Sequence, residues 1–235
     1  MATFVLVHGW WRGGWTFQGV RRDLQSRGHE VFAPSLTGTG ERAHLMGAVT
    51  GLDTWADDVA GLLEAEDLRD VILVGHSFGG VIITAAAERV ATRIKRLVFL
   101  EAAEPRDGER PLDLVPQEIQ ARFPPMDPAA LQRPFPLRAG HGIDESKAAW
   151  ANARLSPMPA RPSLDPVPRK NPHARALPRS YVFAAISNEM LPAFHLRKRL
   201  EAEGTPFEVF EGAHDFPFSH PTEAAALLER LAAIS

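Results

Sequence analysis

The chain has 235 residues, a net charge of -3 at pH 7, 45% hydrophobic residues and 23% charged residues. This length allows one α/β domain with a full core and an insertion, and this composition is typical of a globular protein. The small net charge gives no reason to expect a nucleic acid or an anionic membrane as partner, and the absence of cysteine excludes disulfides, thiolate metal sites and a cysteine nucleophile.

The N-terminus runs from Met1 directly into an apolar segment at 4–7, without the basic stretch and cleavage pattern of a signal peptide. No apolar run reaches the roughly 20 residues that span a bilayer. We therefore expect a cytoplasmic protein that acts on a small molecule. The sequence leaves open whether the chain forms a homodimer.

Six short apolar runs predict strands, and most of them are continuous rather than alternating, as in parallel strands covered on both faces. Helical patterns lie between most of these runs, which predicts a parallel sheet with right-handed crossovers. The predicted strands are 4–7, 30–33, 71–74, 97–100, 181–184 and 207–210, and the predicted helices are 17–27, 52–66, 80–93, 194–202 and 221–233.

The segment 103–178 interrupts this alternation between the fourth and fifth strands and holds most of the chain's 20 prolines. A disordered linker is one interpretation, but apolar residues such as Leu112, Leu131 and Trp150 favour a packed segment. We expect a Pro-rich helical cap over the sheet edge, of the kind that often covers an active site. The core domain then consists of 1–102 and 179–235.

The motif Gly75-His76-Ser77-Phe78-Gly79 has the form G-x-S-x-G and follows a predicted buried strand. At a strand–turn–helix corner this motif lifts a serine oxygen above the sheet edge, beside the N-terminus of the next helix. Ser77 is therefore the candidate nucleophile. The alternative is a structural corner in which the serine caps the helix.

A serine nucleophile needs donors for the oxyanion, and two backbone N–H groups can supply them. Phe78 offers one at the start of the helix, and Trp10 offers the other from the Gly-rich loop at 8–15. Glycines let this loop approach the site closely. The alternative, a surface turn, would leave the three tryptophans of the loop exposed to water.

The base must be a histidine, and the chain has nine. His214 lies just past the last predicted strand, where the chain order serine, acid, histidine leads us to expect the base. His220 lies in the same loop, but it precedes a proline and is typical of a helix entry. We therefore expect His214 to accept the proton of the nucleophile.

Two carboxylates compete for the role of the acid that orients the base. Glu189 follows the fifth predicted strand, which is the usual position, whereas Glu101 ends the fourth. A carboxylate at the end of a buried strand is costly to desolvate without a partner, and His214 could be that partner. We favour Glu101, while Glu189 and a site without an orthodox acid stay open. The structural alternative for Glu101 is a pair with Arg106 or Arg110.

Four aromatic residues predict a pocket for a hydrophobic or aromatic substrate: Trp10, Trp11, Phe78 and Trp150. Of these, Trp11 and Trp150 are the candidate substrate-binding residues. The alternative for Trp150 is that it only packs the cap's own core. Histidines and carboxylates do not cluster at ligand spacing outside the candidate triad, so we expect no metal.

These motifs resemble those of the α/β-hydrolases, and in particular the subgroup of plant hydroxynitrile lyases, methyl-ester-cleaving esterases and their bacterial relatives. The resemblance implies an α/β-hydrolase fold, with about six parallel strands, helices on both faces and a helical cap inserted after the fourth strand. It also implies an acyl-enzyme mechanism without a cofactor. The similar segments are 4–9 with the tryptophan-bearing loop, 75–80 and 212–214, and bacterial members are similar further over 36–45 and 98–108.

Two departures from this subgroup matter. The lyases carry a threonine after the first-loop histidine and a lysine after the catalytic histidine, where this chain has Gly9 and Asp215. Cyanohydrin cleavage is therefore not expected. The subgroup's aspartate after the fifth strand falls around Ser187 and Asn188 here, which makes an acid at Glu101 a hypothesis.

The sequence therefore predicts a serine esterase that cleaves a small, hydrophobic or aromatic carboxylic ester, with a carbamate or another xenobiotic ester as an open possibility. Two alternatives remain, because one scaffold can host many chemistries. One is a receptor-like protein that binds a ligand on the hydrolase scaffold. The other is a C–C lyase or hydrolase. The intact Ser77 and His214 favour catalysis over binding alone.

Overall fold

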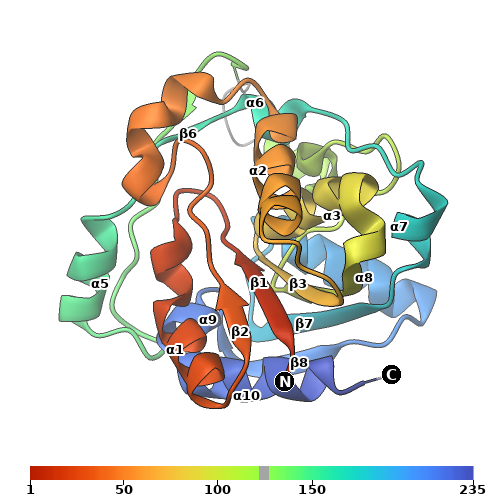
Figure 1. Cartoon of the computed structure of the whole chain (residues 1–235). Helices are drawn as coiled ribbons and strands as arrows, with labels where there is room; N and C mark the ends of the chain where they lie inside the picture. Colours follow the sequence, from red (N-terminus) through yellow and green to blue (C-terminus); the bar gives the residue numbers. More distant parts are fainter. Residues whose placement is uncertain (122–126, 235) are drawn as a thin grey trace.

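The computed structural model describes residues 1–121 and 127–234, so residues 122–126 of the predicted cap and Ser235 lie outside the described residues (Figure 1). Its centre is a six-stranded sheet in the order β2-β1-β3-β4-β7-β8, and every neighbouring pair is parallel. This confirms the predicted parallel sheet. The strands are β1 (Thr3–Val7), β2 (Glu30–Phe32), β3 (Val71–His76), β4 (Ile94–Leu100), β7 (Arg179–Ile186) and β8 (Glu208–Ala213).

Strand boundaries differ from the prediction where polar or exposed residues take part in a strand. β4 begins at Ile94, three residues before the predicted start at 97. The prediction missed this first part because Lys95 and Arg96 are polar, although Arg96 is buried. A guanidinium nitrogen of Arg96 lies 3.0 Å from the Ser180 hydroxyl on the neighbouring strand. β7 runs on to Ile186, whose side chain is exposed. Such residues interrupt the apolar run by which a strand is detected.

Successive strand residues point to opposite faces of the sheet, and each face carries its own core. Phe4 and Leu6 pack with α1 and α10 on one face, whereas Val5 and Val7 pack with α2 and α3 on the other. Figure 1 shows the two groups of helices on opposite sides of the sheet, which confirms helices on both faces. The helices of the core are α1 (Gln18–Ser26), α2 (Leu52–Ala65), α3 (Gly79–Val90), α8 (Pro192–Glu203), α9 (Phe216–Ser219) and α10 (Pro221–Ala232), with 3-10 turns at Gly14–Phe17, Gly40–Ala48 and Ala91–Arg93.

Between β4 and β7 the chain forms short helices and a small antiparallel pair of strands. Three of the described helices in this segment carry a proline at their first or second position, where its fixed φ suits the first helical turn. Figure 1 shows the segment crossing the top of the molecule, from α5 on one side to α7 on the other. Its elements are the 3-10 helix Pro111–Leu114, α4 (Gln117–Gln120), β5 (Leu131–Gln132), α5 (Glu145–Asn152), β6 (Met158–Pro159), α6 (Arg161–Leu164) and α7 (Pro172–Ala176). No helix in the described parts of the chain has both the length and the apolarity needed to cross a membrane.

A buried carboxylate ties both ends of this segment to the sheet. Glu104 is 4% exposed and accepts hydrogen bonds from Arg179 at 2.8 Å and from the Tyr181 hydroxyl, both on β7. Arg169, near the far end of the segment, lies 3.0 Å from the same carboxylate. Burial, together with the nearby Glu104 charge, raises the pKa of Tyr181, so its hydroxyl keeps the proton that it donates.

Gly80 in α3 allows this helix to approach the chain that follows β4. An added Cβ at Gly80 would lie 2.3 Å from the Ala103 carbonyl oxygen. We expect Gly80→Ala to lower the free energy of unfolding by about 1–3 kcal/mol, because α3 must move away. Gly61→Ala in α2 is the matched control, since its added Cβ meets nothing within 4 Å and alanine favours a helix by about 1 kcal/mol. Urea unfolding should show opposite signs for the two variants, and effects of the same sign would contradict the close approach at Gly80.

Candidate active site

Ser77 lies in a tight turn between β3 and α3, with a φ of 56°, in the left-handed region that L-residues rarely adopt. The two glycines of the motif make this turn possible. A Cβ at Gly75 would lie 2.5 Å from the Gly79 carbonyl oxygen, and a Cβ at Gly79 would lie 2.3 Å from the Val7 carbonyl oxygen. The Ser77 N–H donates to the Leu100 carbonyl at 3.2 Å, which fixes the turn to the end of β4.

The ring of His214, the first residue after β8, faces the serine. Its Nε2 lies 3.1 Å from the Ser77 Oγ, a hydrogen-bond distance for a base that accepts the hydroxyl proton. The backbone of His214 is held by the neighbouring motif, because His76 Nε2 donates to the His214 carbonyl at 2.8 Å. Burial and, after it, the nearby His214 together lower the pKa of His76 to about 4, so His76 is a neutral donor at neutral pH.

Glu101 lies at the end of β4, is fully buried and has a φ of 42°. One carboxylate oxygen, Oε2, accepts a hydrogen bond from the Ala184 N–H at 2.7 Å. The other, Oε1, accepts one from the Ser187 hydroxyl and lies 4.0 Å from His214 Nδ1. Burial alone would raise the pKa of Glu101, but His214, Ser187 and the Ala184 N–H outweigh burial and lower it. The carboxylate is therefore ionised and faces the candidate base.

The residues named in the alternatives for the acid lie elsewhere in the structure. Arg106 pairs with Glu203, and Arg110 pairs with Asp113 at 2.6 Å, so neither arginine is the partner of Glu101. Glu189 is exposed on the loop after β7, where its backbone carbonyl accepts from the His195 ring. Of the two carboxylates weighed in the sequence, the structure brings only Glu101 to ion-pair distance of His214.

The loop after β1 lies against the serine. A Cβ at Gly9 would lie 2.7 Å from the Ser77 Cβ, so only glycine allows this approach. In the described part of the chain, neither the Trp10 nor the Phe78 N–H donates a hydrogen bond to another residue, which leaves both able to bind an oxyanion. His8 holds the loop: its Nε2 accepts from the Leu36 N–H at 3.2 Å, and its Nδ1 donates to the Gly9 carbonyl at 2.8 Å.

A buried ion pair links this loop to the histidine loop. Arg12 donates to Asp215 with two nitrogens, at 2.9 Å from Nη2 and 3.3 Å from Nε, and both side chains are largely buried. Burial would raise the pKa of Asp215, but the Arg12 guanidinium outweighs it and lowers the pKa to about 2, with help from His214 and His76. Sequence analysis missed this pair, because the two residues are 203 positions apart and no local pattern connects them.

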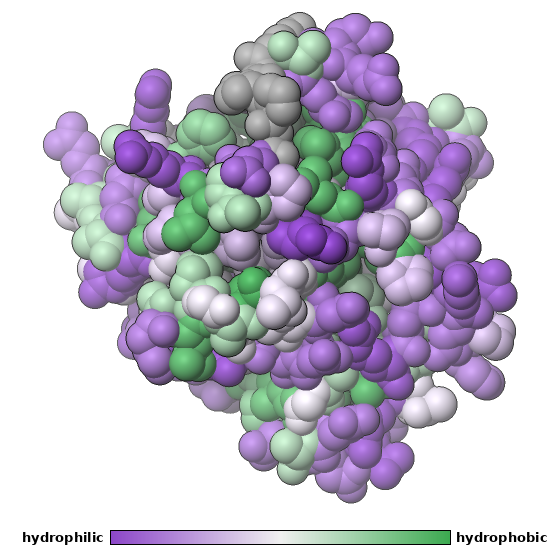
Figure 2. All heavy atoms as spheres, turned by 90° about the horizontal axis from the view of Figure 1, so that it is seen from above, coloured by the Kyte–Doolittle hydropathy of each residue, from purple (hydrophilic) through white to green (hydrophobic). Residues whose placement is uncertain are grey.

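A pocket of about 210 Å³ opens onto Ser77 and His214. Three aromatic rings form a continuous series along it: Trp10 lies 5.2 Å from Trp11, and Trp11 lies 5.1 Å from Phe135, between ring centroids. Phe78, which the sequence also predicts in the pocket, packs behind Trp10 at 5.3 Å and is not among the lining residues. Phe135 is 69% exposed and comes from the segment between β4 and β7. Sequence analysis missed it, since a single phenylalanine between prolines has no distinguishing pattern. Figure 2 shows the face seen from above as a mosaic in which apolar residues are interspersed among hydrophilic ones.

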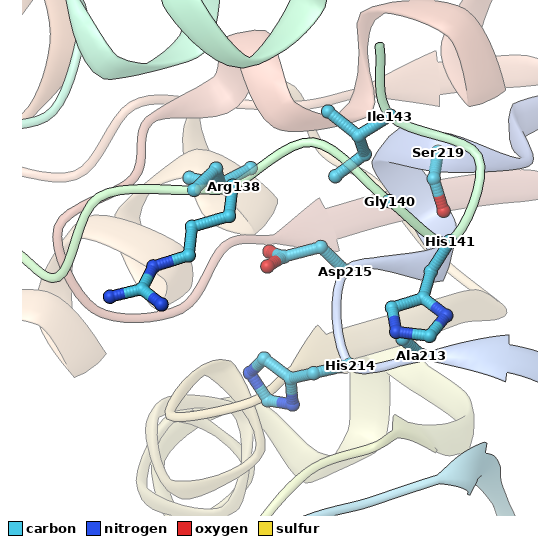
Figure 3. Close-up of a pocket in the computed structure, with 9 residues that line it drawn as sticks. Arg138, Gly140, His141, Ile143, Ala213, His214, Asp215 and Ser219 are labelled. Carbon is cyan, nitrogen blue, oxygen red and sulfur yellow. The ribbon is translucent and has the colours of Figure 1, made fainter. Parts of the chain in front are cut away.

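A second, smaller hollow of about 120 Å³ adjoins this pocket, and Leu137, His214 and Asp215 line both. Figure 3 shows His214 and Asp215 on the loop after β8, below the segment that carries Arg138 and His141. His214 therefore borders a hollow on two sides, and Ser77 lines only the larger one.

Trp150, one of the two candidate substrate-binding residues, is not among the residues that line either hollow. It packs edge-on against Trp15 and parallel to Phe218, with the Arg154 guanidinium 3.9 Å above its ring. This position agrees with a packing role, here between α5 and the core. Within residues 1–121 and 127–234, no group of three or more histidine, aspartate or glutamate side chains is arranged to hold a metal ion.

The buried pair gives a test of the link between the two loops. We expect Asp215→Asn to lower the free energy of unfolding by about 3–5 kcal/mol at pH 7, because it leaves the Arg12 charge buried without a partner. The folded-state pKa of about 2 is below the unfolded value of 3.8, so the pair stabilises the fold above pH 3.8 and loses its effect as the pH falls toward 2. The difference between wild type and variant should therefore shrink over this range in urea unfolding.

Asp67→Asn is the matched control, since Asp67 pairs with Arg93 while 71% of its side chain is exposed. Its effect should stay within about 1 kcal/mol. A difference between wild type and Asp215→Asn that does not change from pH 7 down to pH 2 would contradict the pairing.

Comparisons with known proteins show the family of the chain. The model of the alpha/beta hydrolase family matches residues 4–227. A carbendazim hydrolyzing esterase from Nocardioides sp. (strain SG-4G) is 42% identical over 169 residues, which is 67% of this chain and 69% of the relative. Two solved structures are similar over nearly the whole length: a methylesterase from Arabidopsis, 28% identical with a TM-score of 0.78 over 99% of both chains, and an extracellular alpha/beta-hydrolase from a Paenibacillus species, 26% identical with a TM-score of 0.79 over 98% of both chains. The chain therefore belongs to the alpha/beta hydrolase family.

Proposed function

We propose that the chain is a serine esterase in which Ser77 attacks the ester carbonyl, His214 transfers protons and Glu101 orients His214. The observation that carries this proposal is the 3.1 Å contact between Ser77 Oγ and His214 Nε2 at a left-handed turn that exposes the serine. Because Nε2 accepts the hydroxyl proton, the imidazole carries its own proton on Nδ1. That atom faces the ionised Glu101 carboxylate at 4.0 Å.

The reaction then follows from these positions. Ser77 Oγ forms a bond to the carbonyl carbon and passes its proton to His214, while the N–H groups of Trp10 and Phe78 bind the negative oxygen. The tetrahedral intermediate expels the alcohol, which takes the proton from His214 and leaves an acyl-serine. Water, deprotonated by His214, attacks this acyl group and releases the acid and the free serine. Glu101 stabilises the imidazolium that forms in both halves of the reaction.

The pocket favours a small aromatic substrate. A volume of about 210 Å³ accommodates a compact molecule, and the series from Trp10 through Trp11 to Phe135 offers aromatic faces and edges along it. The Nocardioides relative is named for hydrolysing carbendazim, an aromatic carbamate ester. We therefore propose aromatic esters and carbamates as the substrate class. We also propose that the segment 103–178 acts as a cap, which contributes Phe135, Pro136 and Leu137 to the pocket wall.

Two positions argue against cyanohydrin cleavage. Gly9 supplies no hydroxyl beside Ser77, and Asp215 places a carboxylate, already paired with Arg12, where a lyase carries an ammonium group. A negative charge next to the base gives cyanide no stabilising partner. These differences favour hydrolysis over the lyase alternative.

Hydrolysis of p-nitrophenyl acetate by the wild type and by Ser77→Ala tests this mechanism first. We expect Ser77→Ala to lose activity, because the acyl-enzyme cannot form. Glu101→Gln should lower kcat by about 10²–10⁴, since the imidazolium loses its charged partner, whereas the matched variant Glu189→Gln should keep wild-type activity. Activity that survives in Ser77→Ala, with the fold intact by circular dichroism, would rule out the proposal.

A second variant tests the aromatic wall. Phe135→Ala removes the edge-to-face contact with Trp11, and such aromatic contacts are worth about 0.5–1.5 kcal/mol. We expect KM for an aromatic ester to rise about 2–10-fold, with kcat and the KM for an acetyl ester of an aliphatic alcohol unchanged. Leu131→Ala is the control, because Leu131 is also exposed but lies outside the pocket. An equal rise in KM for both substrates would contradict a role in aromatic recognition.

A further inference from the structure

The Ser187 hydroxyl contacts the carboxylate of Glu101, the proposed acid of the triad. It follows β7, is half-buried and donates a hydrogen bond to Glu101 Oε1. This is the same oxygen that lies 4.0 Å from His214 Nδ1. Within the described residues, Ser187 is the one hydrogen-bond donor to Oε1, while the Ala184 N–H holds Oε2 at 2.7 Å.

Sheet topology explains why a donor is needed at this point. Glu101 ends β4 and His214 follows β8, and β7 lies between these strands in the sheet. Neighbouring strands are about 4.8 Å apart, so the carboxylate must reach across one complete strand to approach the base. A glutamate has one methylene more than an aspartate for this reach, and the extra bond gives its carboxylate more freedom to rotate.

The register places Ser187 within that reach. Val182 on β7 accepts from the Glu101 N–H at 2.7 Å, and Ile186 pairs with Ala213 on β8. Ser187, the first residue after β7, therefore lies at the level of His214, the first residue after β8, and between the acid and the base. A hydroxyl here contacts the end of the long glutamate side chain and not its backbone.

We propose that Ser187 is a positioning residue, which fixes the Glu101 carboxylate toward His214. This inference rests on the proposed function, because it assigns a role to Ser187 through Glu101. With both oxygens held, by Ser187 and by the Ala184 N–H, the carboxylate cannot turn away from the imidazole during the reaction. Among the described residues, Ser187 lines neither hollow and has no hydrogen bond to Ser77.

Ser187→Ala tests this role against a merely structural one. We expect kcat for p-nitrophenyl acetate to fall about tenfold with an unchanged KM, since a hydrogen bond to a charged group is worth about 1.5 kcal/mol or more. We also expect the acid limb of kcat/KM to move to lower pH, because a carboxylate that can turn away stabilises the protonated imidazole less. Ser187→Thr keeps the hydroxyl and should retain the wild-type rate and limb. A rate or a limb that stays at the wild-type value in Ser187→Ala would overturn the proposal.

The geometry allows a second test by exchange. The φ of 42° at position 101 suits glycine, so Glu101→Gly removes the carboxylate and leaves space beside Ser187. We expect Ser187→Asp in this background to raise kcat at least tenfold above that of Glu101→Gly alone, because position 187 follows Ile186, which pairs with Ala213 next to His214. Ser187→Asn in the same background is the uncharged control. Equal rates for the aspartate and asparagine variants would show that position 187 does not face the base, and would overturn the proposal.

The variants distinguish a failure of the serine mechanism from a failure of the positioning role of Ser187. Activity in Ser77→Ala would remove the serine mechanism and the role of Ser187 with it. An inactive Ser77→Ala and an impaired Glu101→Gln, together with a wild-type Ser187→Ala, would leave the triad in place and remove only the positioning role. Thermal unfolding of each variant separates a loss of fold from a loss of rate.

Discussion

The close approach of three backbone segments at the end of β3 is the constraint on which the site depends. Ser77 holds a left-handed φ of 56°, a conformation that costs about 1–3 kcal/mol outside glycine. The turn closes only because Gly9, Gly75 and Gly79 carry no side chain, since a Cβ at each position would lie 2.7 Å or less from its nearest neighbour. Burial of α3 and the bond from Ser77 to Leu100 offset the strain.

Around this turn, burial decides which groups can titrate. His8 and His76 are buried, and burial lowers the pKa of each to about 4, so both stay neutral while the enzyme works near neutral pH. Asp215 stays ionised because Arg12 outweighs its burial, and Glu101 stays ionised because of its donors. Since the folded pKa of His8 and His76 is below their ordinary value of 6.5, both residues favour the unfolded state as the pH falls below 6.5.

Much of the fold could be predicted from the sequence, because buried parallel strands are continuous apolar runs and the motif at 75–79 marks one strand–helix corner. The start of β4 could not, since the polar Lys95 and Arg96 interrupt its pattern. The candidate site likewise has a part that could be predicted from the sequence and a part that could not. Ser77 and His214 are identified by local motif and chain order, whereas the Arg12–Asp215 pair and the contact from Ser187 to Glu101 join residues 203 and 86 positions apart. Such contacts depend on strand order, which no local pattern encodes.

The division of labour between core and cap has an evolutionary consequence. The proposed nucleophile, base, acid and oxyanion donors all come from the strand ends and first loop of the core, while the described residues between β4 and β7 contribute walls of the pocket, such as Phe135. Both ends of this segment are anchored to β7 through Glu104. Selection on such a molecule can therefore change which esters fit without changing how the bond is cut. New substrates, including synthetic ones that no ancestor met, are then reached by small steps that keep the enzyme active throughout.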